Sequence, residues 1–278
     1  MSRRNLLAFM LLLCGFLLAG MGRADSVQRD EPWGIGTNRT MDVYTVPATS
    51  PAPIIVMVHG GGWRIGDKGN PGLAEPKATH YNAMGYVFIA IDYPLLPEAD
   101  PLTQAREVAH ALAFIQRHAA RWHGDGRRVV LMGHSAGAHI VTLLASSPGL
   151  ARQAGAAPWL GTVALDSAAF DVGRIMRGPH FPLYDQAFGT DPAYWSQVSP
   201  LARLDARPAP MLLVCSSLRL ESCPQARAFA AKATSLGGAV RVQPEALSHR
   251  DINLTLGKPG AYTNAVDDFL RSLGGAMP

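Results

Sequence analysis

Few of the 278 residues are charged or aromatic, and three are cysteines. Charged residues make up 17% of the chain and hydrophobic residues 48%, a balance that excludes an intrinsically disordered protein. The sequence has no internal repeat, no low-complexity stretch and no collagen-like or coiled-coil bias. The length suits one large domain, or at most two small ones.

The sequence also lacks the common signatures of metal, cofactor and nucleic-acid binding. It contains no H-E-x-x-H motif, no cysteine pairs at zinc spacing, no dinucleotide-binding glycine pattern and no phosphate loop. Basic residues do not form a stripe interleaved with aromatic ones. We therefore expect no metal, no cofactor and no nucleic-acid partner.

The N-terminus has the pattern of a secretory signal peptide over residues 1–24. Arg3 and Arg4 precede an apolar run over residues 6–19, which is short for a membrane span, and small residues precede Asp25. This segment holds three of the 25 basic residues and no acidic one, so the remaining 22 nearly balance the 21 acidic residues. We expect a periplasmic or extracellular protein with no stable membrane anchor after signal removal; an uncleaved anchor is the alternative.

Export would leave two cysteines in the mature chain. Cys14 lies in the signal segment, whereas Cys215 and Cys223 are eight residues apart. In an oxidising compartment such a pair is expected to form a disulfide. The alternative is two unrelated small residues.

Short apolar runs alternate with helical patterns through residues 25–278, which indicates one domain of the α/β class with a parallel sheet. Strands are expected at residues 41–46, 53–58, 86–91, 128–132, 162–165, 211–214 and 240–242. Helices are expected at residues 102–121, 136–146, 226–236 and 262–273.

Residues 171–200 lack clean periodicity and are rich in aromatic side chains. A long aromatic connection in an α/β domain often covers a site, although ordinary packing of an irregular segment gives the same pattern.

Gly133-His-Ser-Ala-Gly137 matches the G-x-S-x-G nucleophile elbow. The glycines are required because the turn from strand to helix is sharp and crowded, and the turn leaves the Ser135 hydroxyl exposed. The context agrees, since an expected strand precedes the motif and an expected helix follows it. Ser135 is the candidate nucleophile.

A second glycine motif, His59-Gly-Gly-Gly-Trp63, directly follows the strand at residues 53–58. Glycines allow backbone N–H groups to approach a substrate oxygen closely. We expect Gly61 and Gly62, with the N–H of Ala136, to form an oxyanion hole.

These two motifs resemble the HGGGW and GHSAGAH motifs of the carboxylesterase group of α/β-hydrolases. That group includes hormone-sensitive-lipase-like and feruloyl-esterase-like proteins and the arylformamidases. The resemblance covers roughly residues 40–275, and Asp92-Tyr-Pro-Leu-Leu-Pro-Glu98 resembles the DYRLAPE segment of the group, with Pro94 in place of its arginine. It implies a mostly parallel central sheet with helices on both faces.

The resemblance also implies a serine, acid, histidine order along the chain. His249 follows the last expected strand, where the family places its general base. Many relatives carry an aspartate just after the strand at residues 211–214, and here Glu221 is the carboxylate in reach. We expect Glu221 to be the triad acid, oriented by a Cys215–Cys223 bridge; Asp166 and Asp171 are the alternatives.

The expected function is that of an exported serine hydrolase, which cleaves a small-molecule carboxylic ester through an acyl-enzyme on Ser135. An arylformamidase-like amide hydrolase is the enzymatic alternative. A hydrolase-fold binding protein without turnover is the other.

Overall fold

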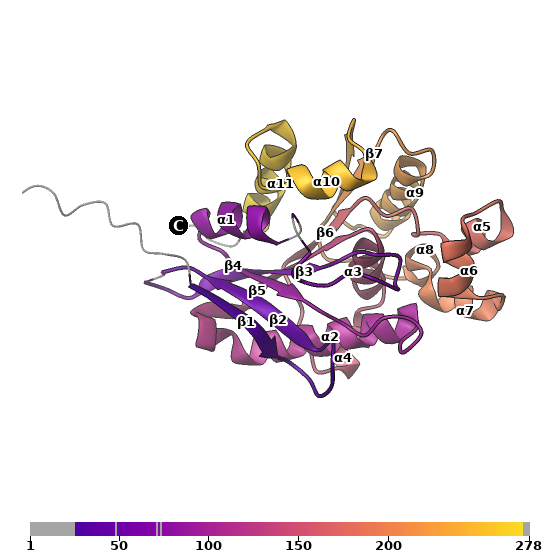
Figure 1. The fold of residues 1–278 in the computed structure, drawn as a ribbon. Coiled ribbons are helices and arrows are strands. Elements are labelled where there is room, and N and C mark those ends of the chain that lie inside the picture. The colour runs from indigo at the N-terminus through magenta and orange to yellow at the C-terminus, as the bar shows by residue number, and fades with distance from the viewer. Residues whose placement is uncertain (1–25, 48, 71, 73, 275–278) are drawn as a thin grey trace, which may run out of the picture.

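A sheet of eight strands forms the centre of the computed structural model, which describes residues 26–274 apart from positions 48, 71 and 73 (Figure 1). The predicted signal peptide and Cys14 lie outside the described residues. The strand order is β1-β2-β4-β3-β5-β6-β7-β8. β1 and β2 pair antiparallel, β2 pairs antiparallel with β4, and β3 to β8 run parallel. The strands are β1 (Ser26–Pro32), β2 (Thr40–Thr45), β3 (Ala52–Val58), β4 (Val87–Ile91), β5 (Gly124–His134), β6 (Gly161–Leu165), β7 (Met211–Ser216) and β8 (Val240–Glu245).

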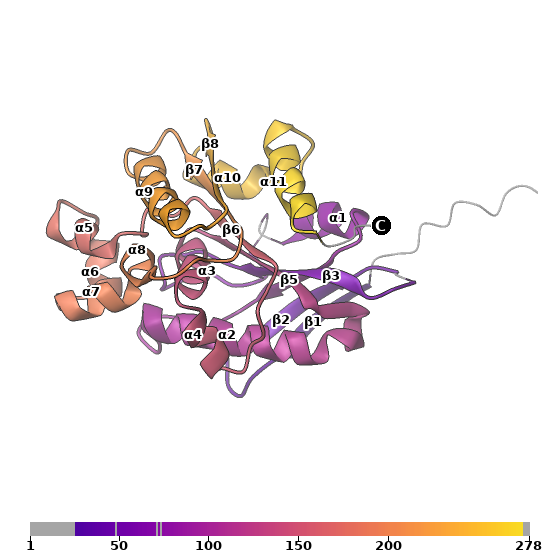
Figure 2. The same ribbon diagram turned by 180° about the vertical axis from the view of Figure 1, so that it is seen from behind.

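Helices cover both faces of this sheet (Figures 1 and 2). One face packs against α1, α10 and α11, and the other against α2, α3 and α9. Every residue of β3, β4 and β6 is buried, as expected for parallel strands between two helical layers. The main helices are α1 (Glu75–Ala83), α2 (Pro101–His118), α3 (Ala136–Ser146), α4 (Pro148–Gln153), α9 (Ser222–Ser235), α10 (His249–Thr255) and α11 (Ala261–Ser272), and η1 (Ala119–Trp122) is a 3₁₀ turn.

The expected α/β class with a mostly parallel sheet is confirmed. The elbow helix has the predicted bounds, Ala136–Ser146. The predicted strand at residues 128–132 is longer, Gly124–His134. β1 was not predicted, because nearly all of its side chains are exposed and it has no apolar alternation.

Residues 171–200 form short helices at one end of the molecule, beyond α3 (Figure 1). Three of the four begin with proline, which is favoured at the first helical position. They are α5 (Val172–Arg177), α6 (Pro182–Phe188), α7 (Pro192–Val198) and α8 (Pro200–Arg203).

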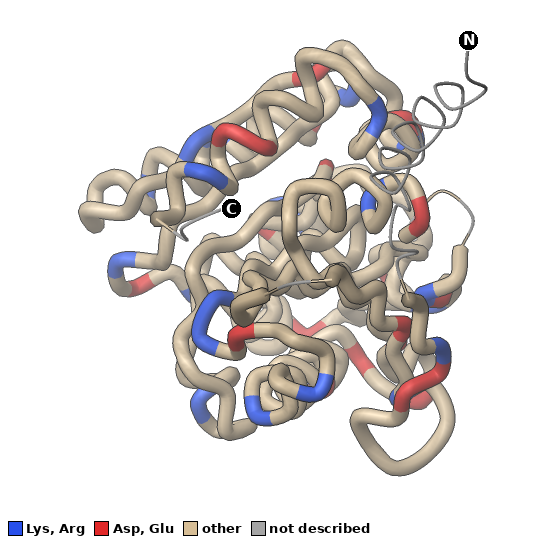
Figure 3. The backbone as a smooth tube through the Cα atoms, turned by 90° about the vertical axis from the view of Figure 1, so that its left-hand side faces the viewer, with Lys and Arg blue, Asp and Glu red and all other residues tan. Residues whose placement is uncertain are grey.

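Basic and acidic residues are interspersed along the chain as seen from the side (Figure 3). Within the described residues, no helix has both the length and the apolar character that crossing a bilayer requires.

Candidate active site

The turn between β5 and α3 holds Ser135 in an unusual backbone conformation. Its φ is 58°, in the left-handed region that is strained for a residue with a side chain. A Cβ at Gly133 would lie 2.4 Å from the carbonyl oxygen of Gly137, and one at Gly137 would lie 2.2 Å from that of Val58. Both glycines of the motif are therefore required by crowding around the turn.

The glycine loop after β3 lies directly against this turn. A Cβ at Gly60 would approach the Ser135 Cβ to 2.8 Å, so the loop and the serine are in contact. Gly61 has a φ of +119° and a Cβ there would lie 1.8 Å from the Ile65 carbonyl oxygen. The predicted oxyanion residues Gly61, Gly62 and Ala136 thus belong to two backbone segments that meet beside Ser135.

His249, the first residue of α10, connects Ser135 to a carboxylate. Its Nε2 lies 2.9 Å from the Ser135 Oγ, and its Nδ1 lies 2.6 Å from Oδ2 of Asp166. Because Asp166 Oδ2 accepts a hydrogen bond from the Nδ1–H group of His249, Nε2 is left to accept the serine proton. Serine, imidazole and carboxylate are aligned as in a Ser-His-Asp triad.

Asp166 follows β6 and is fully buried. Burial alone would raise the pKa of its carboxyl, but the hydrogen bond from His249 and the charge of Arg219 outweigh burial and hold this pKa well below its usual range. The carboxylate also accepts hydrogen bonds from the Ser216 N–H, at 2.7 Å, and from the Ser222 hydroxyl. It is therefore ionised at neutral pH.

The structure does not bring the expected acid, Glu221, to His249. Half of the Glu221 side chain is exposed, and it forms an ion pair with Arg174 at 3.3 Å. The reason is that Asp166 already occupies the position against Nδ1 of His249. Asp171, the other alternative, caps α5 by accepting a hydrogen bond from the N–H of Arg174 at 3.1 Å.

One sequence feature pointed to Asp166. It directly follows a fully buried apolar strand, and a carboxylate in such a place requires charged or hydrogen-bonding partners.

Three other histidines support the site. Burial lowers the pKa of His134 to about 3, and its Nε2 lies 3.0 Å from the backbone oxygen of His249. Burial also lowers the pKa of His139 to about 4. His139 Nδ1 accepts from the Trp63 indole N–H at 3.2 Å and its Nε2 donates to the Val198 carbonyl at 2.7 Å, so it joins the glycine loop to α7.

The third, His59, stacks on Tyr93 with ring centroids 4.4 Å apart. Its Nδ1 lies 2.7 Å from the Gly60 carbonyl oxygen, so the ring supports the start of the glycine loop.

A pocket of about 780 Å³ is lined in part by Arg219, whose Nη1 contacts both Asp166 and His249. Its walls include Phe181 and Tyr184 from the segment over residues 171–200 and Arg219 from the loop after β7. Tyr184 also packs on Trp63, with ring centroids 6.0 Å apart. The segment over residues 171–200 therefore forms one wall of a pocket that Arg219 also lines.

Comparison with known proteins agrees with this geometry. The BD-FAE family model matches residues 41–170, which include the glycine loop, Ser135 and Asp166. The chain has the α/β-hydrolase fold. Its sequence is similar to that of esterase LipQ of Mycobacterium tuberculosis, with 28% identity over 87% of this chain and 61% of LipQ. Kynurenine formamidase of Danio rerio is 32% identical over 47% of this chain and 44% of its own.

The solved structures that resemble this chain include two esterases. Esterase B from Lactobacillus rhamnosis aligns with a TM-score of 0.70 at 19% identity, over 89% of this chain and 84% of its own. The apo form of Thermogutta terrifontis esterase 2 aligns with a TM-score of 0.70 at 21% identity, over 91% and 96%. At these identities the likeness establishes the fold. The chain spans 26% of the probable carboxylic ester hydrolase LipM of Mycobacterium tuberculosis and 61% of LipQ.

Proposed function

We propose that this α/β-hydrolase is a serine esterase that cleaves carboxylic esters through an acyl-enzyme on Ser135. The observation that carries the proposal is the chain of contacts from Ser135 Oγ through His249 to Asp166, at 2.9 and 2.6 Å. The relatives named as esterases support the same reaction class.

In the acylation step, Ser135 Oγ attacks the ester carbonyl carbon while His249 Nε2 takes the hydroxyl proton. Asp166 keeps the imidazole in the correct tautomer and stabilises the imidazolium that forms. The oxyanion is held by the backbone N–H groups of Gly61, Gly62 and Ala136. His249 then donates the proton to the departing alkoxide, which leaves as the alcohol.

In the deacylation step, His249 takes a proton from a water molecule, which attacks the acyl carbonyl. The second tetrahedral intermediate collapses to the free acid and the proton returns to Ser135 Oγ. Each of the two steps thus uses the same base and the same backbone donors.

The mature protein is proposed to act outside the cytoplasm. The positive, apolar and small-residue pattern of residues 1–24 supports export, and so does the Cys215–Cys223 disulfide, since disulfides persist in oxidising compartments. Expression of the full chain tests this: the exported fraction should begin at or near Asp25 by N-terminal sequencing.

Labelling with a fluorophosphonate probe tests the reaction class. The native protein should be labelled on Ser135 and should hydrolyse short-chain carboxylic esters, whereas Ser135→Ala should do neither. Absence of labelling in a folded native protein would refute the proposal.

An amide hydrolase like the arylformamidases is the second candidate, favoured by the match to kynurenine formamidase, which is 32% identical over 47% of this chain. Comparing kcat/KM for N-formylkynurenine with that for short acyl esters separates the two. A preference for the formamide would replace the esterase assignment.

A further inference from the structure

The loop between β7 and α9, residues 217–221, carries an arginine at the triad. Arg219 Nη1 lies 2.7 Å from Asp166 Oδ2 and 3.3 Å from the Asp166 backbone oxygen.

Arg219 and His249 both donate to the same oxygen. Asp166 Oδ2 accepts from His249 Nδ1 at 2.6 Å and from Arg219 Nη1 at 2.7 Å, which places the two nitrogens 3.1 Å apart. The Arg219 side chain is 30% exposed, whereas the Asp166 side chain is fully buried. A permanent positive charge next to a buried carboxylate favours the ionised form, and Arg219 supplies that charge.

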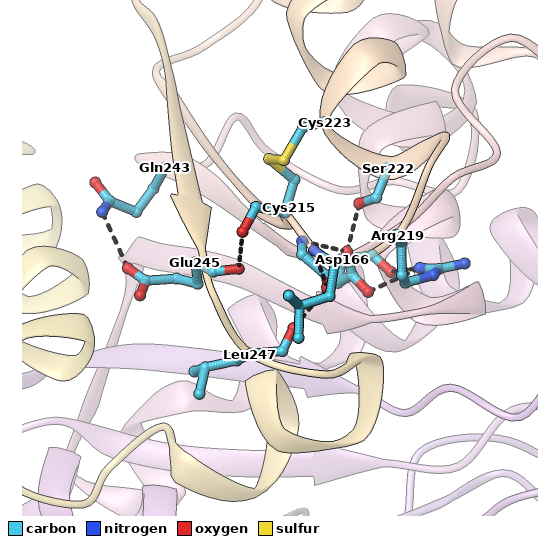
Figure 4. Close-up of a disulfide and its surroundings, with 11 residues drawn as sticks. Asp166, Cys215, Arg219, Ser222, Cys223, Gln243, Glu245 and Leu247 are labelled. Atoms are coloured by element: carbon cyan, nitrogen blue, oxygen red, sulfur yellow. Dashed lines mark hydrogen bonds and ion pairs between the residues drawn. A yellow bond between two sulfur atoms is a disulfide. The ribbon is translucent and has the colours of Figure 1, made fainter.

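The same loop satisfies the other carboxylate oxygen. Oδ1 of Asp166 accepts from the Ser216 N–H and from the Ser222 hydroxyl, which flank the loop on its two sides. Figure 4 shows Arg219 and Ser222 converging on Asp166. The carboxylate therefore accepts hydrogen bonds from four donors, which fix its plane: the Ser216 N–H, Arg219, Ser222 and His249.

A covalent link closes this loop next to those donors. The Cys215–Cys223 disulfide joins the residue before Ser216 to the residue after Ser222, with the Cα atoms 5.1 Å apart (Figure 4). Both cysteines are buried. The link restrains both ends of the segment that holds Asp166.

We propose that Arg219 is a positioning residue for the proposed hydrolysis, and that the Cys215–Cys223 disulfide holds its loop in place. Arg219 acts through Asp166: it keeps the carboxylate ionised and aligned on His249 Nδ1. This inference rests on the proposed esterase function. The sequence suggested that the disulfide orients Glu221. Because Glu221 does not contact Ser135, His249 or Asp166, we infer instead that the disulfide acts through Arg219 and Asp166.

The test is a double-mutant cycle between Arg219 and Asp166, measured with a short-chain ester. In the native background, Arg219→Met should lower kcat roughly 10- to 100-fold, the effect of losing a charge-assisted hydrogen bond, and Arg219→Lys should recover part of the loss. In the Asp166→Asn background, Arg219→Met should lower kcat no further, because the carboxylate through which Arg219 acts is gone. Arg271→Met is the matched control, since Arg271 pairs with Asp268 at 2.8 Å on α11, outside the site.

Four results would overturn the positioning role. An equal loss of kcat in both backgrounds would show that Arg219 does not act through Asp166. A rise in KM at unchanged kcat would show a substrate-binding role. An unchanged kcat for Arg219→Met, with a native enzyme that is active and labelled on Ser135, would overturn the inference and leave the proposed function intact. A folded native protein that is neither labelled nor active would overturn both.

The disulfide is tested in the same way with the double variant Cys215→Ala and Cys223→Ala. It should lower kcat in the native background but not in the Arg219→Met background, because both changes release the same restraint. Fluorophosphonate labelling of Ser135 and the melting temperature report whether the variant is folded. Full kcat in a folded protein without the disulfide would overturn this part.

Discussion

Asp166→Asn tests the identity of the triad acid. The amide has the shape of the carboxylate, but its two ends differ. If its oxygen takes the place of Oδ1 and accepts from the Ser216 N–H, its NH₂ group faces the Nδ1–H of His249 and the Arg219 guanidinium. If its oxygen takes the place of Oδ2, its NH₂ group faces the Ser216 N–H instead.

The first orientation drives His249 into the tautomer in which Nε2 carries the proton, so Nε2 no longer accepts the proton of Ser135. A wrong tautomer in a serine triad costs about 10⁴-fold in kcat, or about 5 kcal/mol in transition-state stabilisation. Glu221→Gln is the comparison: this side chain is half exposed, so loss of its ion pair with Arg174 should change kcat/KM by no more than a few-fold.

The assay is the initial rate of short-chain ester hydrolysis by both variants, with melting temperatures to confirm that they are folded. The assignment is refuted if Asp166→Asn keeps more than about a tenth of the native kcat/KM. It is refuted equally if Glu221→Gln loses more than about a hundredfold.

Two further predictions concern the glycine loop and a buried lysine. Gly61→Ala should abolish activity and lower the melting temperature, because the new Cβ would lie 1.8 Å from a backbone oxygen. At Gly62 a new Cβ would meet no atom within 4 Å, so Gly62→Ala should lower the free energy of unfolding by only about 1–2 kcal/mol, the cost of a left-handed φ for alanine. Equal effects of the two substitutions on activity and melting temperature would contradict this prediction. Burial and, to a smaller extent, the charge of Lys258 lower the pKa of Lys77 from 10.5 to about 7. Between these two pH values the unfolded state therefore binds more protons than the folded state. The contribution of Lys77 to the free energy of unfolding should accordingly rise by about 1.4 kcal/mol for each pH unit. Urea denaturation of native protein and Lys77→Met at pH 7 and 9 checks this, and a difference independent of pH would refute it.

The sequence predicted the elements whose burial pattern is regular. The apolar strands of the parallel sheet and the elbow helix were found because their side chains are buried almost throughout. α1 was not found because its buried side includes Lys77 and Asn82, which hide the apolar period. α5 to α8 were not found because helices of four to seven residues are too short to show one.

For the candidate site, the sequence singled out Ser135, His249 and the glycine loop, since each lies within or just after a local pattern, and the structure brings them together. The acid has no such pattern. Two neighbouring strands, β6 and β7, could each place a carboxylate against the imidazole. Which strand does so depends on the folded structure and cannot be inferred from the spacing of residues along the chain. The pairing of Arg219 with Asp166 is likewise a contact across 53 residues of chain.

Either strand end can supply the acid, for a geometric reason. β6 and β7 are parallel neighbours, and the Asp166 N–H donates to the Val214 carbonyl at 2.9 Å, so both strands end at the same edge of the sheet. Carboxylates from both ends could not share one imidazole nitrogen without strong repulsion between like charges in a buried site. With Asp166 held against His249, hydrogen-bond donors and a cation from the loop after β7 stabilise its negative charge. Arg219, Ser222 and the Ser216 N–H do so, and Glu221 turns outward to Arg174.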